Sequence, residues 1–200
     1  MVTELNPVTF IKRLGRAHQL MVALAVLMAV VAPTAFVLTF SQLFWLEMIS
    51  IYVTSIFLLW IGLIDAKYFT IPNQLLLMWL GIQSIILTMT LVVGHVDTLI
   101  NATLGAVVMG IFFLITYYLS KKTLGGGDVK LAFIMGLSMG IHLILSAVFY
   151  GLIICAVFSI VALATKKLTK KDALPLAPFL FCGMIATYLL EIIAYLWLNQ

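Results

Sequence analysis

Long apolar runs separated by short polar connections dominate the sequence. A helix needs roughly 20 apolar residues to cross the hydrocarbon core of a bilayer, and most of these runs approach that length. The predicted spans cover residues 20–40, 45–64, 74–93, 98–119, 129–141, 142–164 and 174–198. The pattern therefore predicts an all-α, polytopic membrane helix bundle of about seven transmembrane helices.

The apolar runs leave little chain for a separate soluble domain. We expect residues 1–19 to form a cytoplasmic amino-terminal segment and residues 20–200 to form a single membrane-embedded domain. The first run follows a basic stretch and ends near Ala32-Pro33-Thr34-Ala35, which also fits a cleaved signal peptide. Because the apolar run continues beyond that point, we favour an uncleaved span.

Composition agrees with a membrane location. Hydrophobic residues make up 64% of the chain and charged residues 9%, and the mean hydropathy is +1.24. Soluble domains have roughly 45–50% apolar and about 25% charged residues. The net charge of +4 does not indicate a nucleic-acid surface, because the eleven basic residues fall in short clusters between the apolar runs. Such clusters set the orientation of a membrane protein.

The basic clusters predict which ends of the spans face the cytoplasm. If every cluster is cytoplasmic, an even number of crossings separates neighbouring clusters. Two crossings must then fit into the short interval between Lys130 and Lys166, with a turn near Gly136, Gly140 and His142. A single long span there would place the last cluster outside, so we favour the hairpin. The amino terminus is then inside and the carboxyl terminus outside.

Two acids stand at the cytoplasmic ends of apolar runs in this topology, Asp65 and Asp128. Ionisable residues at membrane depth are costly, which favours a functional role. Two neighbouring carboxyl groups do not both ionise readily, so one can act as a general base while the other acts as a general acid. The expected helix dipoles favour Asp128 as the base and Asp65 as the acid.

A glycine run, Gly125-Gly126-Gly127, precedes Asp128. Glycine permits positive φ angles and close approach of a second chain, so an extended substrate could pair with the backbone here. The alternative is a flexible connection in which Asp128 is an ordinary helix cap. The run is not a phosphate-binding loop, because no Gly-Lys-Ser/Thr follows it. Asp65 also has a purely structural interpretation, in which it is a charged residue that faces water beside a tight turn.

No metal or cofactor site is predicted. Cys155 and Cys182 lie in apolar runs and form no C-x-x-C pair. The histidines are far apart in sequence and make no H-E-x-x-H pattern.

The two acidic stretches together match a known pattern. Asp65 is followed by six residues and then Pro72-Asn73, and the second stretch reads Gly-x-Gly-Asp-x-Lys, ending at Lys130. A proline-bearing segment, residues 174–180, begins the last apolar run. With these motifs the chain resembles the type IV prepilin peptidase family, membrane aspartyl proteases of the GxGD kind. The resemblance covers roughly residues 45–198, a six-span core with one extra span in front.

The resemblance implies that Asp65 and Asp128 are the catalytic pair and that no cofactor is needed. It implies that the substrate is a prepilin or pseudopilin, whose short basic leader is cut at the inner face just before a hydrophobic helix. Residues expected to contact the substrate are Gly125, Gly126, Gly127, Lys130, Lys67, Pro72 and Asn73. Lys130 or Lys67 is expected to pair with an acidic residue shortly after the cut site.

The chain departs from bifunctional members of this family in one respect. Those members carry a cytoplasmic region with two C-x-x-C pairs that is linked to N-methylation, and this sequence has no such pair. We therefore predict peptidase activity alone.

Two other functions stay open at this point. Presenilin-type proteases also use Gly-x-Gly-Asp, but their first aspartate follows Tyr and their late motif reads Pro-Ala-Leu. This chain instead has Ile64 before the first aspartate and Pro175-Leu176-Ala177 near its end. From a different class, a transporter or structural subunit could use Asp65 and Asp128 as an ion or proton relay. The sequence leaves open which prepilin is cut, for which pathway, and the oligomeric state.

Overall fold

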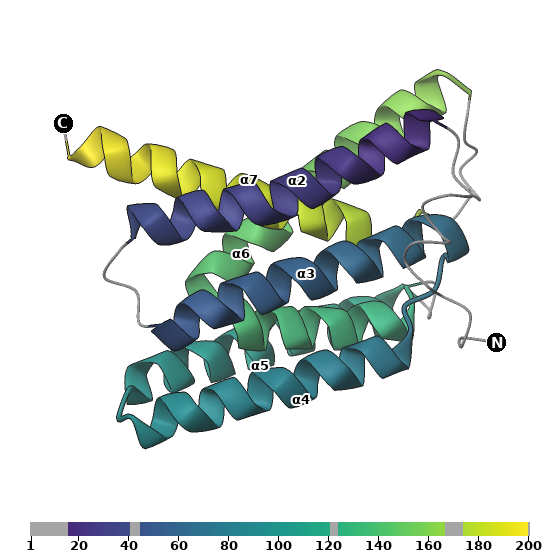
Figure 1. Ribbon diagram of the computed structural model, residues 1–200. Coiled ribbons are helices and arrows are strands. Elements are labelled where there is room, and N and C mark those ends of the chain that lie inside the picture. Colours follow the sequence, from purple (N-terminus) through teal and green to yellow (C-terminus); the bar gives the residue numbers. More distant parts are fainter. Residues whose placement is uncertain (1–15, 41–44, 121–123, 167–173, 200) are drawn as a thin grey trace.

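The computed structural model describes residues 16–40, 45–120, 124–166 and 174–199. Within these ranges the chain forms six helices (Figure 1): α2 Arg16–Thr39, α3 Trp45–Tyr68, α4 Asn73–Val92, α5 Val96–Leu119, α6 Gly126–Ala164 and α7 Ala177–Leu198. Each of the six is long and apolar enough to cross a membrane. The prediction of an all-α membrane protein is confirmed. Residues 1–15, most of the predicted amino-terminal segment, lie outside the described residues.

The predicted count of about seven separate helices is wrong, because the described residues form six. The predicted runs 129–141 and 142–164 belong to one element, the 39-residue α6. Its helical backbone is broken at Gly140, where φ is 71° and ψ is 170°. The backbone thus departs from the helix near the predicted turn, but no connecting loop separates the two parts. A positive φ is accessible to glycine at little cost, which explains the residue at this point.

The part of α6 before Gly140 packs closely on α5. A Cβ atom on Gly105 of α5 would lie 2.5 Å from the carbonyl oxygen of Gly136, and one on Gly140 would lie 2.5 Å from Nδ2 of Asn101. Two glycines facing each other let the helix backbones touch, as is common in membrane bundles. Gly136 of α6 thus contacts Gly105 of α5, and Gly140, four residues later on α6, contacts Asn101, four residues earlier on α5. This part of α6 therefore runs antiparallel to α5.

The part of α6 after Gly140 packs on α7 instead. Gly183 of α7 contacts the backbone of Gly151, and a Cβ atom on Gly151 would lie 2.9 Å from the carbonyl oxygen of Phe179. The ring of Phe158 lies 5.4 Å from that of Phe179, at the start of α7. The second part of α6 thus returns toward the beginning of α7, and Figure 1 shows the chain changing direction within α6.

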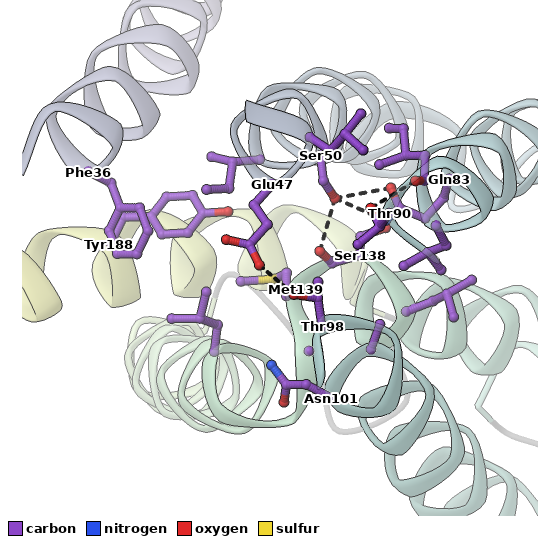
Figure 2. Close-up of a pocket in the computed structure, with 18 residues that line it drawn as sticks. Phe36, Glu47, Ser50, Gln83, Thr90, Thr98, Asn101, Ser138, Met139 and Tyr188 are labelled. Atoms are coloured by element: carbon purple, nitrogen blue, oxygen red, sulfur yellow. Dashed lines mark hydrogen bonds between the residues drawn. The ribbon is translucent and has the colours of Figure 1, made fainter. Parts of the chain in front are cut away.

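Polar side chains surround the break in α6 (Figure 2). Ser50 of α3 donates a hydrogen bond of 3.1 Å to the carbonyl oxygen of Ser138, and Gln83 of α4 donates one of 3.0 Å to Ser50. Asn101 accepts a 3.1 Å hydrogen bond from the backbone N–H of Ile141. Backbone groups released by a helix break inside a bilayer need such partners. A cavity of about 170 Å³, lined by Ser50, Gln83 and Asn101 among other residues, lies beside these hydrogen bonds.

One end of the bundle gathers the end of α3 and the beginnings of α4, α6 and α7. The contacts that define this end are Asp65 with Ala177, Asn73 with Lys130, and Ile71 with Gly127. At the opposite end, Thr98 near the start of α5 donates a 2.8 Å hydrogen bond to Glu47 near the start of α3. Fully buried side chains of α3, α6 and α7 form the core between the two ends: Leu58, Ile61, Leu131, Met135, Leu180 and Met184.

Candidate active site

Asp65 is buried in the last turn of α3. Its side chain is 5% exposed, and Oδ2 accepts a 3.1 Å hydrogen bond from the backbone N–H of Ala177. Ala177 is the first residue of α7, and the first N–H groups of a helix have no partner within that helix. The buried carboxylate thus satisfies one of these donors. A Cβ atom on Gly62, one turn earlier, would lie 3.4 Å from Cα of Pro178, so α3 and α7 pack tightly here.

Sequence reasoning did not identify Ala177 as the partner of Asp65. The signal in the sequence was Pro178, which lies in the first turn of α7 and marks a helix start. The proline-bearing segment was predicted to begin the last helix, and that is where the structure places it. What could not be read from the sequence is that this helix start faces Asp65.

Asp128 lies in the first turn of α6 and is half-buried. Its Oδ2 accepts a 3.2 Å hydrogen bond from the backbone N–H of Gly125, the residue that caps the helix. The carboxylate therefore reaches back to stabilise the helix start, as acidic residues in the first turn often do. This capping contact uses one oxygen of the carboxylate. A structural role at the helix start is thus compatible with a chemical role.

The structure brings Asp65 and Asp128 together at one end of the bundle. They lie close enough for the charge of Asp65 to act on Asp128. Each accepts an N–H from the start of a helix, Ala177 of α7 or Gly125 of α6. Because both carboxylates face helix starts, the helix dipoles do not distinguish Asp128 as the base from Asp65 as the acid. We therefore leave open which acid acts as the base and which as the acid.

The glycine run acts through close packing and not through unusual φ angles. Gly125 has an extended backbone with φ of −68°, and Gly126 and Gly127 begin α6. None of the three has a positive φ, so that part of the sequence interpretation is wrong. The reason is that the helix starts two residues before Asp128. A Cβ atom on Gly125 would lie 2.9 Å from Oδ2 of Asp128, and one on Gly127 would lie 3.0 Å from Cβ of Ile71.

The expected substrate-contacting residues lie at the same end of the bundle, in two groups. Lys130 of α6 donates a 3.0 Å hydrogen bond to Oδ1 of Asn73, the first residue of α4. Pro72 is the N-cap residue of α4. Lys67 instead follows Asp65 on α3, where its Nζ lies 5.2 Å from the centroid of the Tyr68 ring. The two lysines therefore belong to different groups, Lys130 with the start of α4 and Lys67 with the end of α3.

No cluster of metal-binding side chains occurs in the part of the chain that the structure describes. No three His, Cys, Asp or Glu residues come together there. Cys155 and Cys182 are both free thiols, on α6 and α7 respectively.

Comparisons with known proteins point to one family. The Type IV leader peptidase family matches residues 52–160, more than half of the 200-residue chain. The prepilin leader peptidase/N-methyltransferase of Bacillus subtilis (strain 168) is 28% identical over 129 residues, which are 64% of this chain and 50% of that protein. The chain thus spans about half the length of this curated relative. No solved structure gives a significant match. The chain belongs to the Type IV leader peptidase family.

Proposed function

We propose that the chain is a membrane aspartic endopeptidase that removes the short basic leader from type IV prepilins or prepilin-like proteins. The observation that carries this proposal is that Asp65 and Asp128 lie at the same end of the bundle, near enough for their charges to interact. Both residues fall in the range that matches the family. The printed name of the Bacillus subtilis relative supports a prepilin as the substrate.

The paired acids suit peptide hydrolysis. One carboxylate takes a proton from a water molecule, which attacks the carbonyl carbon of the scissile bond. The partner acid gives a proton to the leaving nitrogen as the C–N bond breaks. The products are a leader with a new carboxyl group and a pilin with a new amino terminus. The N–H groups of Ala177 and Gly125 orient the two carboxylates for these transfers.

Residues around the acids are proposed to position the substrate. Gly125 and Gly126 are exposed beside Asp128, which leaves room for an extended peptide backbone. Lys67 and Lys130 are exposed at the same end of the bundle and offer positive charge to an acidic residue after the cut site. The contact between Lys130 and Asn73 fixes the start of α4 to the start of α6.

We propose that this end of the bundle faces the cytoplasm. The described Lys67, Lys130 and Lys166 all belong to helix ends on this side, and basic residues favour the cytoplasmic face. With the change of direction at Gly140, α6 would cross the bilayer twice and the chain seven times. The amino terminus is then inside and the carboxyl terminus outside. The protein would be a multi-pass component of the cell membrane.

A relay role in a transporter is less well supported, because Asp65 lies in the last turn of α3 and Asp128 in the first turn of α6. Relay carboxylates of transporters lie near the middle of the bilayer.

The proposal is tested by co-expressing the chain with a candidate prepilin. Wild type should convert the prepilin to a shorter form, and Asp65→Asn and Asp128→Asn should each abolish the conversion at unchanged levels in the membrane. Asp97→Asn is the matched control, because Asp97 lies in the first turn of α5 at the opposite end of the bundle. Conversion retained by either variant of the pair would contradict the proposal.

A further inference from the structure

A second feature near the acids is an apolar groove between α2, α3 and α7. It measures about 660 Å³ and lies along the halves of these helices that are nearest to Asp65. Its small residues include Ala25 of α2, and Gly62 and Ala66 of α3. Lys67 is the one charged residue among those that line it. We call this feature the α2–α7 groove.

The α2–α7 groove ends at the turn of α3 that carries Asp65, although Asp65 itself does not line it. Ala66 and Lys67, which line it, are the next two residues after Asp65 on α3. Pro178, which also lines it, follows the residue whose N–H binds Asp65. A peptide that leaves the groove at this end would therefore lie near the helix turn that carries the Asp65 carboxylate.

The groove also extends into the membrane. On α3 it runs from Leu59 to Lys67, and at a rise of about 1.5 Å per residue this covers roughly 12 Å. The hydrocarbon core of a bilayer is about 30 Å thick, so the groove reaches toward its middle. A chain that approaches Asp65 along this path must be helical, because its backbone N–H and C=O groups have no water to bind.

We propose that the α2–α7 groove holds the apolar helix of the substrate, the segment that follows the scissile bond. This inference rests on the proposed peptidase function and extends it to the mode of substrate recognition. Small residues along a groove let a helix backbone approach closely. Helix-in-groove binding of this kind relies on side chains that recur every three or four residues.

The positive charge of Lys67 at the rim of the groove is compatible with binding of the substrate helix. The first turn of a substrate helix would lie near Lys67, the charged residue of the lining. An acidic residue in that turn is stabilised by the positive end of its own helix dipole and by the lysine. One wall of the groove comes from α2, which ends at Thr39, before the matched range begins at residue 52. The recognition surface thus includes chain outside the shared family region.

The native cysteines allow a direct test. Cys182 lines the groove, whereas Cys155 on α6 does not. A Cys155→Ser variant keeps Cys182 alone, and a Cys182→Ser variant is the matched control with Cys155 alone. Each is combined with Asp128→Asn and co-expressed with prepilins that carry one cysteine at successive positions of the apolar helix. Oxidation in native membranes should form disulfides between Cys182 and prepilin cysteines at positions that recur every three or four residues along the apolar helix. Equal joining to Cys155, or none to Cys182, overturns the inference.

Filling the groove gives a second measurement. Cys182→Trp should lower prepilin processing at least tenfold at an unchanged level in the membrane. Val157→Trp is the control, because Val157 is an exposed apolar residue of α6 that does not line the groove. Normal processing by Cys182→Trp, as expected if only lipid occupies the groove, contradicts the inference and leaves the proposed function intact. Failure of wild type to process any prepilin would instead contradict the proposed function.

Discussion

Gly105 of α5 and Gly136 of α6 are in backbone contact, and neither position has room for a side chain. This contact holds the first part of α6 against α5. Asp128 lies eight residues before Gly136 on the same helix, roughly 12 Å along its axis. The glycine contact therefore helps to set the position of an acid that lies far from it.

Substitution at this contact should be costly. Gly105→Ala places a Cβ atom 2.5 Å from the carbonyl oxygen of Gly136, so one helix must move. We expect a loss of about 1–3 kcal/mol in the free energy of unfolding, the usual range for overpacking. Reversible denaturation in detergent measures it. Gly81→Ala is the control, since no atom lies within 4 Å of a Cβ there. Equal stability of the two variants would contradict the packing argument.

Gly140→Ala should also destabilise the protein, for a different reason. The φ of Gly140 is +71°, which an L-residue adopts only with strain, and Asn101 occupies the space of the new Cβ atom. The expected result is a lower midpoint of thermal unfolding than for Gly81→Ala, together with reduced prepilin processing. A variant as stable as Gly81→Ala would show that the break in α6 does not depend on glycine.

The lysines near the acids should respond to charge on the substrate. We expect Lys67→Ala or Lys130→Ala to weaken processing of a prepilin that has an acidic residue after the cut site. Processing of a prepilin with glutamine at that position should change less, because the favourable charge pair is already lost. The rates of all four enzyme and substrate combinations are compared for each lysine. If neither lysine shows such coupling, their proposed role in substrate binding is wrong.

The proposed orientation predicts which positions a membrane-impermeant thiol reagent reaches in intact cells. In a background of Cys155→Ser and Cys182→Ser, Val96→Cys at the start of α5 should be labelled from outside. Lys166→Cys, just after α6, should be labelled only after the membrane is permeabilised. Labelling of Lys166→Cys in intact cells would show that residue 166 faces the outside, which contradicts the proposed orientation of this part of the chain. It would also rule out a double crossing by α6 if the start of α6 is cytoplasmic.

Much of this architecture could be predicted from the sequence, because long apolar runs and proline or glycine boundaries are local signals. The helical runs, the backbone break near Gly140 and the placement of both acids at helix ends follow from such signals. The number of helices was overestimated, because hydropathy cannot tell a broken helix from two helices joined by a loop. The hydrogen bond between Ala177 and Asp65 joins residues 112 positions apart, and no pattern in a single sequence reports that contact.

The dependence of Asp65 on α7 bears on how functional relatives are recognised. The family match ends at residue 160, whereas the N–H that faces this acid comes from residue 177. A homologue could therefore keep both aspartate motifs and still lack the donor that accommodates one of them in a dry interior. A search by the two aspartate motifs alone would not tell such chains from chains that keep the donor. The proline-bearing entry to the last helix is a third feature that the search should require.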